Sequence, residues 1–130
     1  MPTVVADSEA KAREGAAWFL SFYVTTMGTI YRDSLTRQGY GKAVNAVVEA
    51  NAPKFAGVVP ADAEELLEQL IVYGTPAEAR RRLGRWHAAG ADLPVLLLRP
   101  NLTPEERDLT LQTFRPMLKS RPGASVQQES

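Results

Sequence analysis

The sequence predicts an α/β fold that is mostly helical and contains two short parallel strands. Residues 3–6, "TVVA", form a β-branched run directly before a helix cap. Helical periodicity covers most of the chain. Residues 74–98, "GTPAEARRRLGRWHAAGADLPVLLL", have the pattern of a capped helix, a glycine stop and an apolar strand. An alternation of strands and helices of this kind is typical of parallel sheets.

The first predicted strand leads into a long helix over residues 9–27, which Asp7 or Ser8 can cap. Trp18 and Phe22 add a second apolar stripe to the main one, so this helix needs cover on two sides. The main stripe consists of Ala12, Ala16, Phe19, Leu20, Tyr23 and Met27.

Three further helices are expected before the second strand. A short one follows Gly28 and ends near Gly39, because glycine adopts the left-handed conformation that closes a helix. Another covers residues 42–51, and residues 52–60 form a loop. The third covers residues 61–74 and has one apolar stripe, formed by Ala63, Leu66, Leu67, Leu70 and Ile71.

The next helix begins at Pro76, with Thr75 as its N-cap and Glu78 completing a capping box. The arginine run 80–82 is expected on its solvent face. The predicted inward face consists of Ala79, Leu83, Trp86 and Gly90.

Residues 94–98, "PVLLL", are apolar on consecutive positions, which predicts a buried strand. Thr103 and Glu106 repeat the capping device, so a final helix is expected over residues 104–118. Residues 119–130 are polar and predict a disordered tail. Two parallel strands alone leave both edges open, so something else must complete the sheet.

The composition narrows the classes of function. Fifteen basic and fifteen acidic residues give zero net charge, without the basic excess typical of nucleic-acid binding. The absence of cysteine excludes thiolate chemistry and cysteine-ligated metals, and one histidine cannot form a metal cluster. His87 is expected at the surface, and no metal site is predicted.

The location of the protein is expected to be cytoplasmic, because the first fifteen residues lack the pattern of a secretory signal. Residues 15–31 carry no formal charge, but glycine, serine and threonine interrupt them. We therefore expect a helix buried in protein rather than one inserted in a membrane.

Three blocks of this sequence resemble the C-terminal part of the luciferase-like monooxygenase superfamily. They are "VVADSEAKAREGAAWFLSFYVTTMG", "YRDSLTRQGYG" and "VYGTPAEARRRLGRWHAAGADLPVLLL". The resemblance covers about residues 3–118 and depends mainly on the order and spacing of the blocks. Its most specific parts are the Gly-Thr-Pro-x-Glu helix start and the Ala-Gly-Ala-Asp turn.

The resemblance implies that residues 1–118 are part of a (β/α)8 TIM barrel without its first six strands. "PVLLL" would then pair with the seventh strand on one side and with the first strand on the other. The implied assignment is the seventh strand at 3–6, a helical insertion at about 8–73, the seventh helix at 76–89, the eighth strand at 94–98 and the closing helix at 104–118.

The implied activity is that of an oxidoreductase or monooxygenase that uses FMN or coenzyme F-420. Because most of the barrel lies outside this sequence, the chain is not expected to be catalytically complete by itself. Its partner would be the missing barrel half or further copies of itself. An alternative interpretation is a helical binding or oligomerisation module without redox activity.

Candidate cofactor-binding residues follow from the rule that barrel chemistry occurs at the C-terminal ends of the strands. Arg99 lies directly after the last strand, where its guanidinium could bind an anionic group or form a local salt bridge. Gly74 and Thr75 start a helix whose free N–H groups favour an anion, although Thr75 could simply cap the helix.

Tyr23, Tyr31 and Tyr40 are candidate substrate-pocket residues. They lie on the insertion, which in the resembled family covers the barrel mouth. Aromatic residues at helical spacing also occur in protein cores, so both interpretations are open.

Overall fold

The computed structural model describes residues 1–117. The predicted tail at 119–130 and the last residue of the predicted closing helix lie outside this range. The strands are β1 (Pro2–Val5), β2 (Val72–Gly74) and β3 (Leu97–Leu98), and the helices are α1 (Glu9–Thr25), α2 (Ile30–Leu35), α3 (Gly41–Ala50), α4 (Glu64–Leu70), α5 (Pro76–Ala88) and α6 (Pro104–Phe114). A π-helical turn, Thr36–Tyr40, and 3-10 turns, Ala61–Ala63 and Arg115–Met117, adjoin α2, α4 and α6.

The three strands form one parallel sheet in the order β2-β1-β3. β1 lies in the centre, where Thr3 pairs with Val72 on one side and with Leu98 on the other. The predicted pairing of "PVLLL" with "TVVA" is therefore confirmed. The fold is α/β and mostly helical, as predicted, but its sheet has three strands.

The prediction of a helix through residues 61–74 is wrong at its end, because residues 72–74 form β2. α4 stops at Leu70, and Ile71 has extended dihedrals, φ −117° and ψ 134°. Val72 is fully buried and Tyr73 is 6% exposed. Their pairing with β1 outweighs the helical pattern, which cannot separate a short apolar run from a strand.

The expectation of a buried strand at 94–98 is also wrong. Only Leu97 and Leu98 are in β3, and this strand is an edge of the sheet. The side chains of Val95 and Leu97 are 70% and 44% exposed. Within the described residues, other side chains pack against only one face of this apolar segment, the face that carries Leu96.

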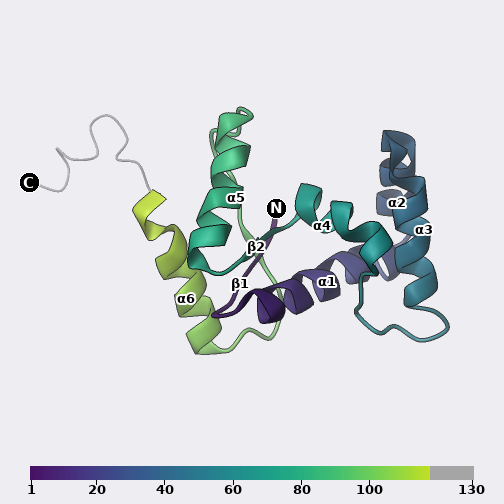
Figure 1. The fold of residues 1–130 in the computed structure, drawn as a ribbon, viewed down its shortest axis with the longest axis horizontal. Coiled ribbons are helices and arrows are strands. Elements are labelled where there is room, and N and C mark those ends of the chain that lie inside the picture. The colour runs from purple at the N-terminus through teal and green to yellow at the C-terminus, as the bar shows by residue number, and fades with distance from the viewer. Residues whose placement is uncertain (118–130) are drawn as a thin grey trace, which may run out of the picture.

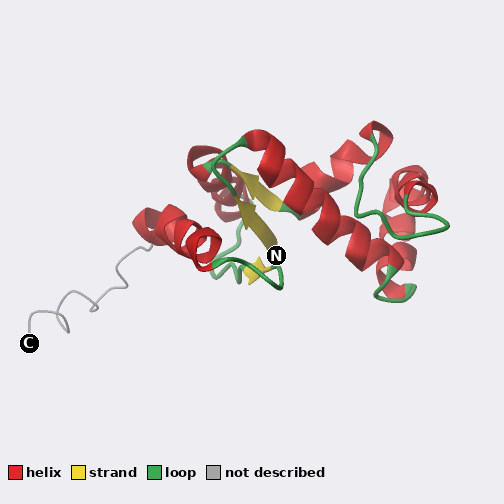
Figure 2. Cartoon of the chain, turned by 90° about the horizontal axis from the view of Figure 1, so that it is seen from below, coloured by secondary structure: helices red, strands yellow, loops and turns green. Residues whose placement is uncertain are grey.

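Helices cover the sheet on both faces (Figures 1 and 2). One face packs against α1, which α3 and α4 support, and the other face packs against α5 and α6. The first core includes Val4, Leu20, Val47, Leu66 and Leu67. The second core includes Val5, Val72, Ala79, Leu83 and Phe114.

The strand order of this sheet differs from the order of three consecutive strands in a (β/α)8 barrel. In a barrel, strands that follow one another in the chain are neighbours. Here β1 lies between β2 and β3, so those two strands do not touch. The 117 described residues form a small open sheet between two helical layers.

Several local predictions are confirmed. Ser8 caps α1 by accepting a hydrogen bond from the Lys11 N–H. Thr103 and Glu106 form the predicted capping box at α6. Gly39 has the predicted left-handed conformation, with φ 98°. No described helix is long and apolar enough to cross a bilayer.

Candidate functional site

The carboxyl end of the sheet has two crevices, one on each side of β1. The chain leaves β1 towards α1 on one face, whereas it leaves β2 and β3 towards α5 and α6 on the other. Neighbouring loops therefore diverge at both borders of β1. Such switch points are where open α/β sheets bind ligands.

The larger crevice lies between α1 and α6 and has a volume of about 410 Å³. Its floor is the end of β1, from Thr3 to Asp7. The walls consist of Lys11, Glu14, Gly15 and Trp18 of α1, Ala56 and Gly57 of the loop after α3, and Arg99, Leu102, Glu105, Glu106 and Leu109 around α6. We call it the Arg99 crevice.

Arg99 has free hydrogen-bonding capacity in this crevice. Its side chain is 31% exposed, and its nearest carboxylate oxygen, on Glu106, is 3.7 Å from Nη2. That distance is too long for a hydrogen bond. Its Nε is buried and makes no hydrogen bond within the described residues. The guanidinium can therefore donate hydrogen bonds to an oxyanion without losing an existing hydrogen bond.

Carboxylates limit what the Arg99 crevice can bind. Asp7 is paired with Lys11 at 3.4 Å, and Glu106 is engaged by the N-cap Thr103. Glu14 and Glu105 also line the crevice. A highly charged anion would be repelled, whereas a molecule with one anionic group and an apolar body matches the mixed lining.

The second crevice lies between α1 and α5, has a volume of about 370 Å³ and includes Gly74 but not Arg99. Gly74 has φ 138°, and an added Cβ would lie 2.6 Å from Glu78 Cγ. This close approach accounts for the glycine, and it places the Glu78 side chain over the start of α5. An anion is disfavoured there.

The predicted capping box at the start of α5 is wrong. Thr75 occupies the N-cap position, but its side chain makes no capping hydrogen bond. Glu78 turns instead towards the arginines, accepting hydrogen bonds from Arg81 and lying 3.4 Å from Arg82 Nε. Attraction to two cations outweighs the bond to the backbone.

The prediction that the arginine run lies mostly outward is wrong for Arg82, which is 7% exposed. Its guanidinium donates two hydrogen bonds to Glu68, Nη1 to Oε2 at 2.6 Å and Nη2 to Oε1 at 2.9 Å. It also lies over the Tyr73 ring, 4.1 Å from the centroid. These contacts tie α5 to α4 and β2.

Burial and ion pairing shift several pKa values in this network. Hydrogen bonds from Arg82 lower the pKa of Glu68, and Tyr73 adds to the effect through its hydroxyl, which donates to Glu68 at 3.1 Å. Burial raises the pKa of Tyr73 to about 12, although Arg82 opposes the shift. The network is therefore ionised at Glu68 and neutral at Tyr73 near pH 7.

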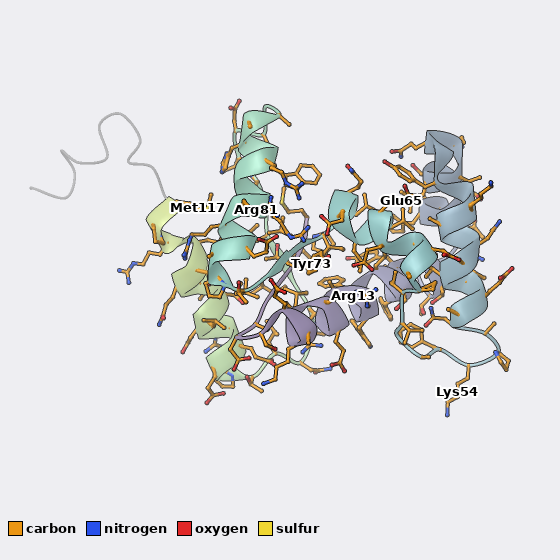
Figure 3. All side chains as sticks on the ribbon, viewed as in Figure 1. Arg13, Lys54, Glu65, Tyr73, Arg81 and Met117 are labelled. Atoms are coloured by element: carbon orange, nitrogen blue, oxygen red, sulfur yellow. The ribbon has the colours of Figure 1, made fainter. Side chains whose placement is uncertain are left out.

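Arg13 extends the same wall on α1. Its Nε donates to both carboxylate oxygens of Glu64 at 3.1 Å, and its Nη2 donates to the Val59 carbonyl at 3.0 Å. Figure 3 labels Arg13 and Tyr73 on α1 and β2. Each arginine of this crevice already has a carboxylate partner, so the wall is structural.

The lowered pKa of Glu68 predicts an acid-dependent stability. A carboxylate with a lowered folded-state pKa stabilises the fold above its ordinary value of 4.5 and loses that contribution as the pH falls through the lowered value. Glu68→Gln is therefore expected to lose less stability than the wild type on acidification below pH 4.5. Urea denaturation midpoints between pH 3 and 6 would measure this.

The control for that titration is Glu65→Gln, an exposed position on the same helix. This variant is expected to follow the acid dependence of the wild type. If Glu68→Gln also follows it, the ion pair with Arg82 does not contribute as described.

The tyrosines lie at the other end of the sheet. Tyr23 and Tyr31 line a groove of about 410 Å³ with Met1, Pro2 and Leu97, at the amino-terminal ends of β1 and β3. Their rings contact edge to face, with centroids 5.1 Å apart. Burial, with a contribution from Tyr31, raises the pKa of Tyr23.

Tyr40 does not line this groove and packs instead against the α1–α3–α4 core. The structure thus brings Tyr23 and Tyr31 together but places neither of them near Arg99 or Gly74. Arg99 and Gly74 themselves lie in separate crevices.

Comparison with known proteins gave one family. The model of the luciferase-like monooxygenase family matches residues 1–93, which is more than half of the chain. No curated protein and no solved structure matched. The matched region contains β1, the helices α1–α4, β2 and α5, whereas Arg99 lies outside it. On this match, the chain belongs to the luciferase-like monooxygenase family.

Proposed function

We propose that the chain forms the C-terminal part of an oxidoreductase that uses FMN or coenzyme F-420. Family membership supports this proposal, since luciferase-like enzymes are generally flavin- or F-420-dependent. The observation that supports it here is the Arg99 crevice at the carboxyl end of the sheet, where a partly exposed guanidinium has no hydrogen-bonded acceptor among residues 1–117.

The residues of the crevice fit the anionic end of such a cofactor. Arg99 would bind one phosphate or carboxylate oxygen, with Lys11 on the opposite wall. Trp18, Leu102 and Leu109 offer apolar contacts to the adjoining part of the molecule. When bound, the cofactor supplies hydride transfer or oxygen activation, and these residues hold and orient it.

The chain is not catalytically complete in this proposal. Of the two cationic groups that line the Arg99 crevice, Lys11 is already paired with Asp7, and the sheet has three strands where the family's barrel has eight. Further polypeptide would supply the remaining groups around the reactive ring. The prediction that follows is weak cofactor binding without turnover.

Replacing Arg99 by alanine is expected to weaken the binding of FMN or F-420 about tenfold or more, because a hydrogen bond to a charged group contributes about 1.5–3 kcal/mol. Titration of the cofactor's fluorescence with the purified chain measures the dissociation constant. Inorganic phosphate should compete if Arg99 binds a phosphate.

The control is Arg107→Ala, which removes the same charge from an exposed side chain paired with Asp108. It is expected to leave binding unchanged. Equal losses in both variants would contradict a specific role for Arg99. Absence of any cofactor binding by the wild type would favour the alternative, a binding module without redox activity.

A further inference from the structure

The side chain of Asn51, at the end of α3, holds the loop that leads to α4. Asn51 is 6% exposed, and its Nδ2 donates to the carbonyls of Val47 at 2.8 Å and Val58 at 2.9 Å. Its Oδ1 accepts from the N–H groups of Ala56, Gly57 and Val58 at 3.2, 2.8 and 3.2 Å. One side chain therefore fixes three consecutive residues of this loop.

The same loop residues form part of the wall of the Arg99 crevice. Ala56 and Gly57 line the crevice beside Trp18 of α1. Gly57 has φ 69°, and an added Cβ would lie 2.8 Å from Trp18 Cδ1. Glycine therefore allows the loop backbone to lie close to the indole ring. Asn51 itself does not line the crevice, so any effect on a ligand passes through the loop.

Two phenylalanine rings pack against Trp18 and fix its orientation. The indole stacks on Phe22, with centroids 5.2 Å apart, and Phe55 of the loop contacts both rings edge to face at 6.3 and 6.4 Å. On the α6 side of the crevice lie Leu102 and Leu109. Apolar groups thus occur on both sides, which suits a flat ring bound between them.

The hydrogen bonds of Asn51 do more than cap α3. The last carbonyls of a helix need donors, and Nδ2 supplies one to Val47. The three bonds that Oδ1 accepts satisfy no group of the helix, because all three come from the loop. The next residue, Val59, is held separately by Arg13 Nη2 and by burial in the first core. Oδ1 therefore acts on the segment that lines the crevice.

We propose that Asn51 is a positioning residue, which holds the loop wall so that the Arg99 crevice binds an aromatic ring carrying one anionic group. The inference rests on the proposed function, because it assigns the ring of the bound molecule to the wall formed by Trp18 and Gly57. Arg99 donates to the anionic group, and Asn51 acts without touching the ligand. The carboxylates of the crevice disfavour a second anionic group.

The fluorescence of Trp18 tests the position of the loop without any ligand. Trp86→Phe leaves Trp18 as the sole tryptophan. In this background Asn51→Leu, which is similar in size but cannot form hydrogen bonds, is expected to shift the emission to longer wavelength, since the loop no longer covers the ring. Asn51→Asp keeps an acceptor for the three N–H groups and is expected to retain the wild-type emission.

Gly57→Ala tests the wall with Asn51 intact. Its Cβ pushes the loop away from Trp18, so the emission is expected to shift as in Asn51→Leu. Gly28→Ala is the matched control, because its φ of 81° gives similar backbone strain, whereas no atom of residues 1–117 beyond its chain neighbours lies within 4 Å of the new Cβ. The control is expected to lose stability without a shift. This pair decides the question if Asn51→Leu does not fold.

Two pairs of ligands test binding and separate this inference from the proposed function. Benzoate and acetate share a carboxylate, and FMN and inorganic phosphate share a phosphate, so each ratio of dissociation constants reports the ring. The wild type is expected to bind benzoate roughly tenfold more tightly than acetate. Asn51→Leu and Gly57→Ala are expected to reduce that ratio about fivefold and to leave acetate binding unchanged, whereas Asn51→Asp and Gly28→Ala retain it. Quenching of Trp18 measures benzoate and FMN, and competition against benzoate measures acetate and phosphate.

The outcomes distinguish the two proposals. A wild type that prefers benzoate to acetate but binds neither FMN nor F-420 would contradict the proposed function and support this inference, provided that Asn51→Leu loses the preference. FMN binding with the same ring preference in Asn51→Leu and the wild type would overturn this inference alone. Equal losses in Asn51→Asp and Asn51→Leu, or in Gly57→Ala and Gly28→Ala, would also overturn it, because these residues would then contribute to stability only. A wild type without ring preference overturns it as well.

Discussion

Arg82→Ala is expected to lower the free energy of unfolding by about 3 kcal/mol, at the lower end of the range for breaking a buried ion pair, because Glu68 is 39% exposed. The truncation leaves Glu68 without its two-pronged partner and removes the cation over the Tyr73 ring. It also leaves a cavity between α4, β2 and α5. Urea denaturation followed by circular dichroism measures the change.

The neighbouring Arg81 provides the matched control. Both arginines lie on α5 and both contact Glu78, but the Arg81 side chain is 56% exposed. Exposed ion pairs contribute little to stability, so Arg81→Ala is expected to leave the denaturation midpoint near that of the wild type. Similar midpoints for the two variants would contradict the assignment of Arg82 as the buried member of the run.

Arg82 shows which part of the site lay beyond sequence reasoning. Three consecutive arginines on a helix are typical of a solvent face, but only Arg81 is exposed, whereas Arg80 is half-buried and donates to the Thr113 carbonyl. The third is buried because Glu68, fourteen residues earlier, lies across from it in the fold. The local sequence of α5 does not predict that Glu68 is the partner of Arg82.

The strands, too, could be predicted from the sequence only where neighbouring residues determine them. β1 and the caps of α1 and α6 could be predicted because neighbouring residues determine them. β2 was missed because Val72 and Tyr73 continue an apolar helical pattern and become a strand only through pairing with β1. The exposure of β3 depends on which surfaces the helical layer leaves uncovered, which is a tertiary property.

The predicted site residues separate for a geometric reason. The strand-end rule placed Arg99 at the carboxyl end of the sheet, and it lies in a crevice there. Tyr23 is the fifteenth residue of α1, so at about 1.5 Å per residue it lies some 20 Å along the helix from the end of β1 and about 7 Å beyond Trp18, the last α1 residue that lines the crevice. Its groove is accordingly at the amino-terminal end of the strands.

Gly74→Ala is the second substitution with a large expected effect, a loss of about 3 kcal/mol in the free energy of unfolding. The φ of 138° is strained for any residue with a Cβ, and the new atom would lie 2.7 Å from Glu78 Cβ and 2.6 Å from its Cγ. Both atoms belong to the first turn of α5, so either the helix start or β2 must shift. Chemical denaturation without ligand measures the loss.

Gly84→Ala on the same helix should have the opposite sign. Apart from its own helix backbone and chain neighbours, no atom of residues 1–117 lies within 4 Å of the position for its Cβ, and Gly84 lies in the interior of α5. Alanine there is expected to stabilise the fold by about 0.5–1 kcal/mol, because it reduces the freedom of the unfolded chain. Glu78→Gly removes both clashing atoms but also the contacts with Arg81 and Arg82, so Gly74→Ala is expected to cost less stability when it is added to Glu78→Gly than when it is added to the wild type. If Gly74→Ala costs the same in both backgrounds, backbone strain and not the contact with Glu78 explains why glycine is required at position 74.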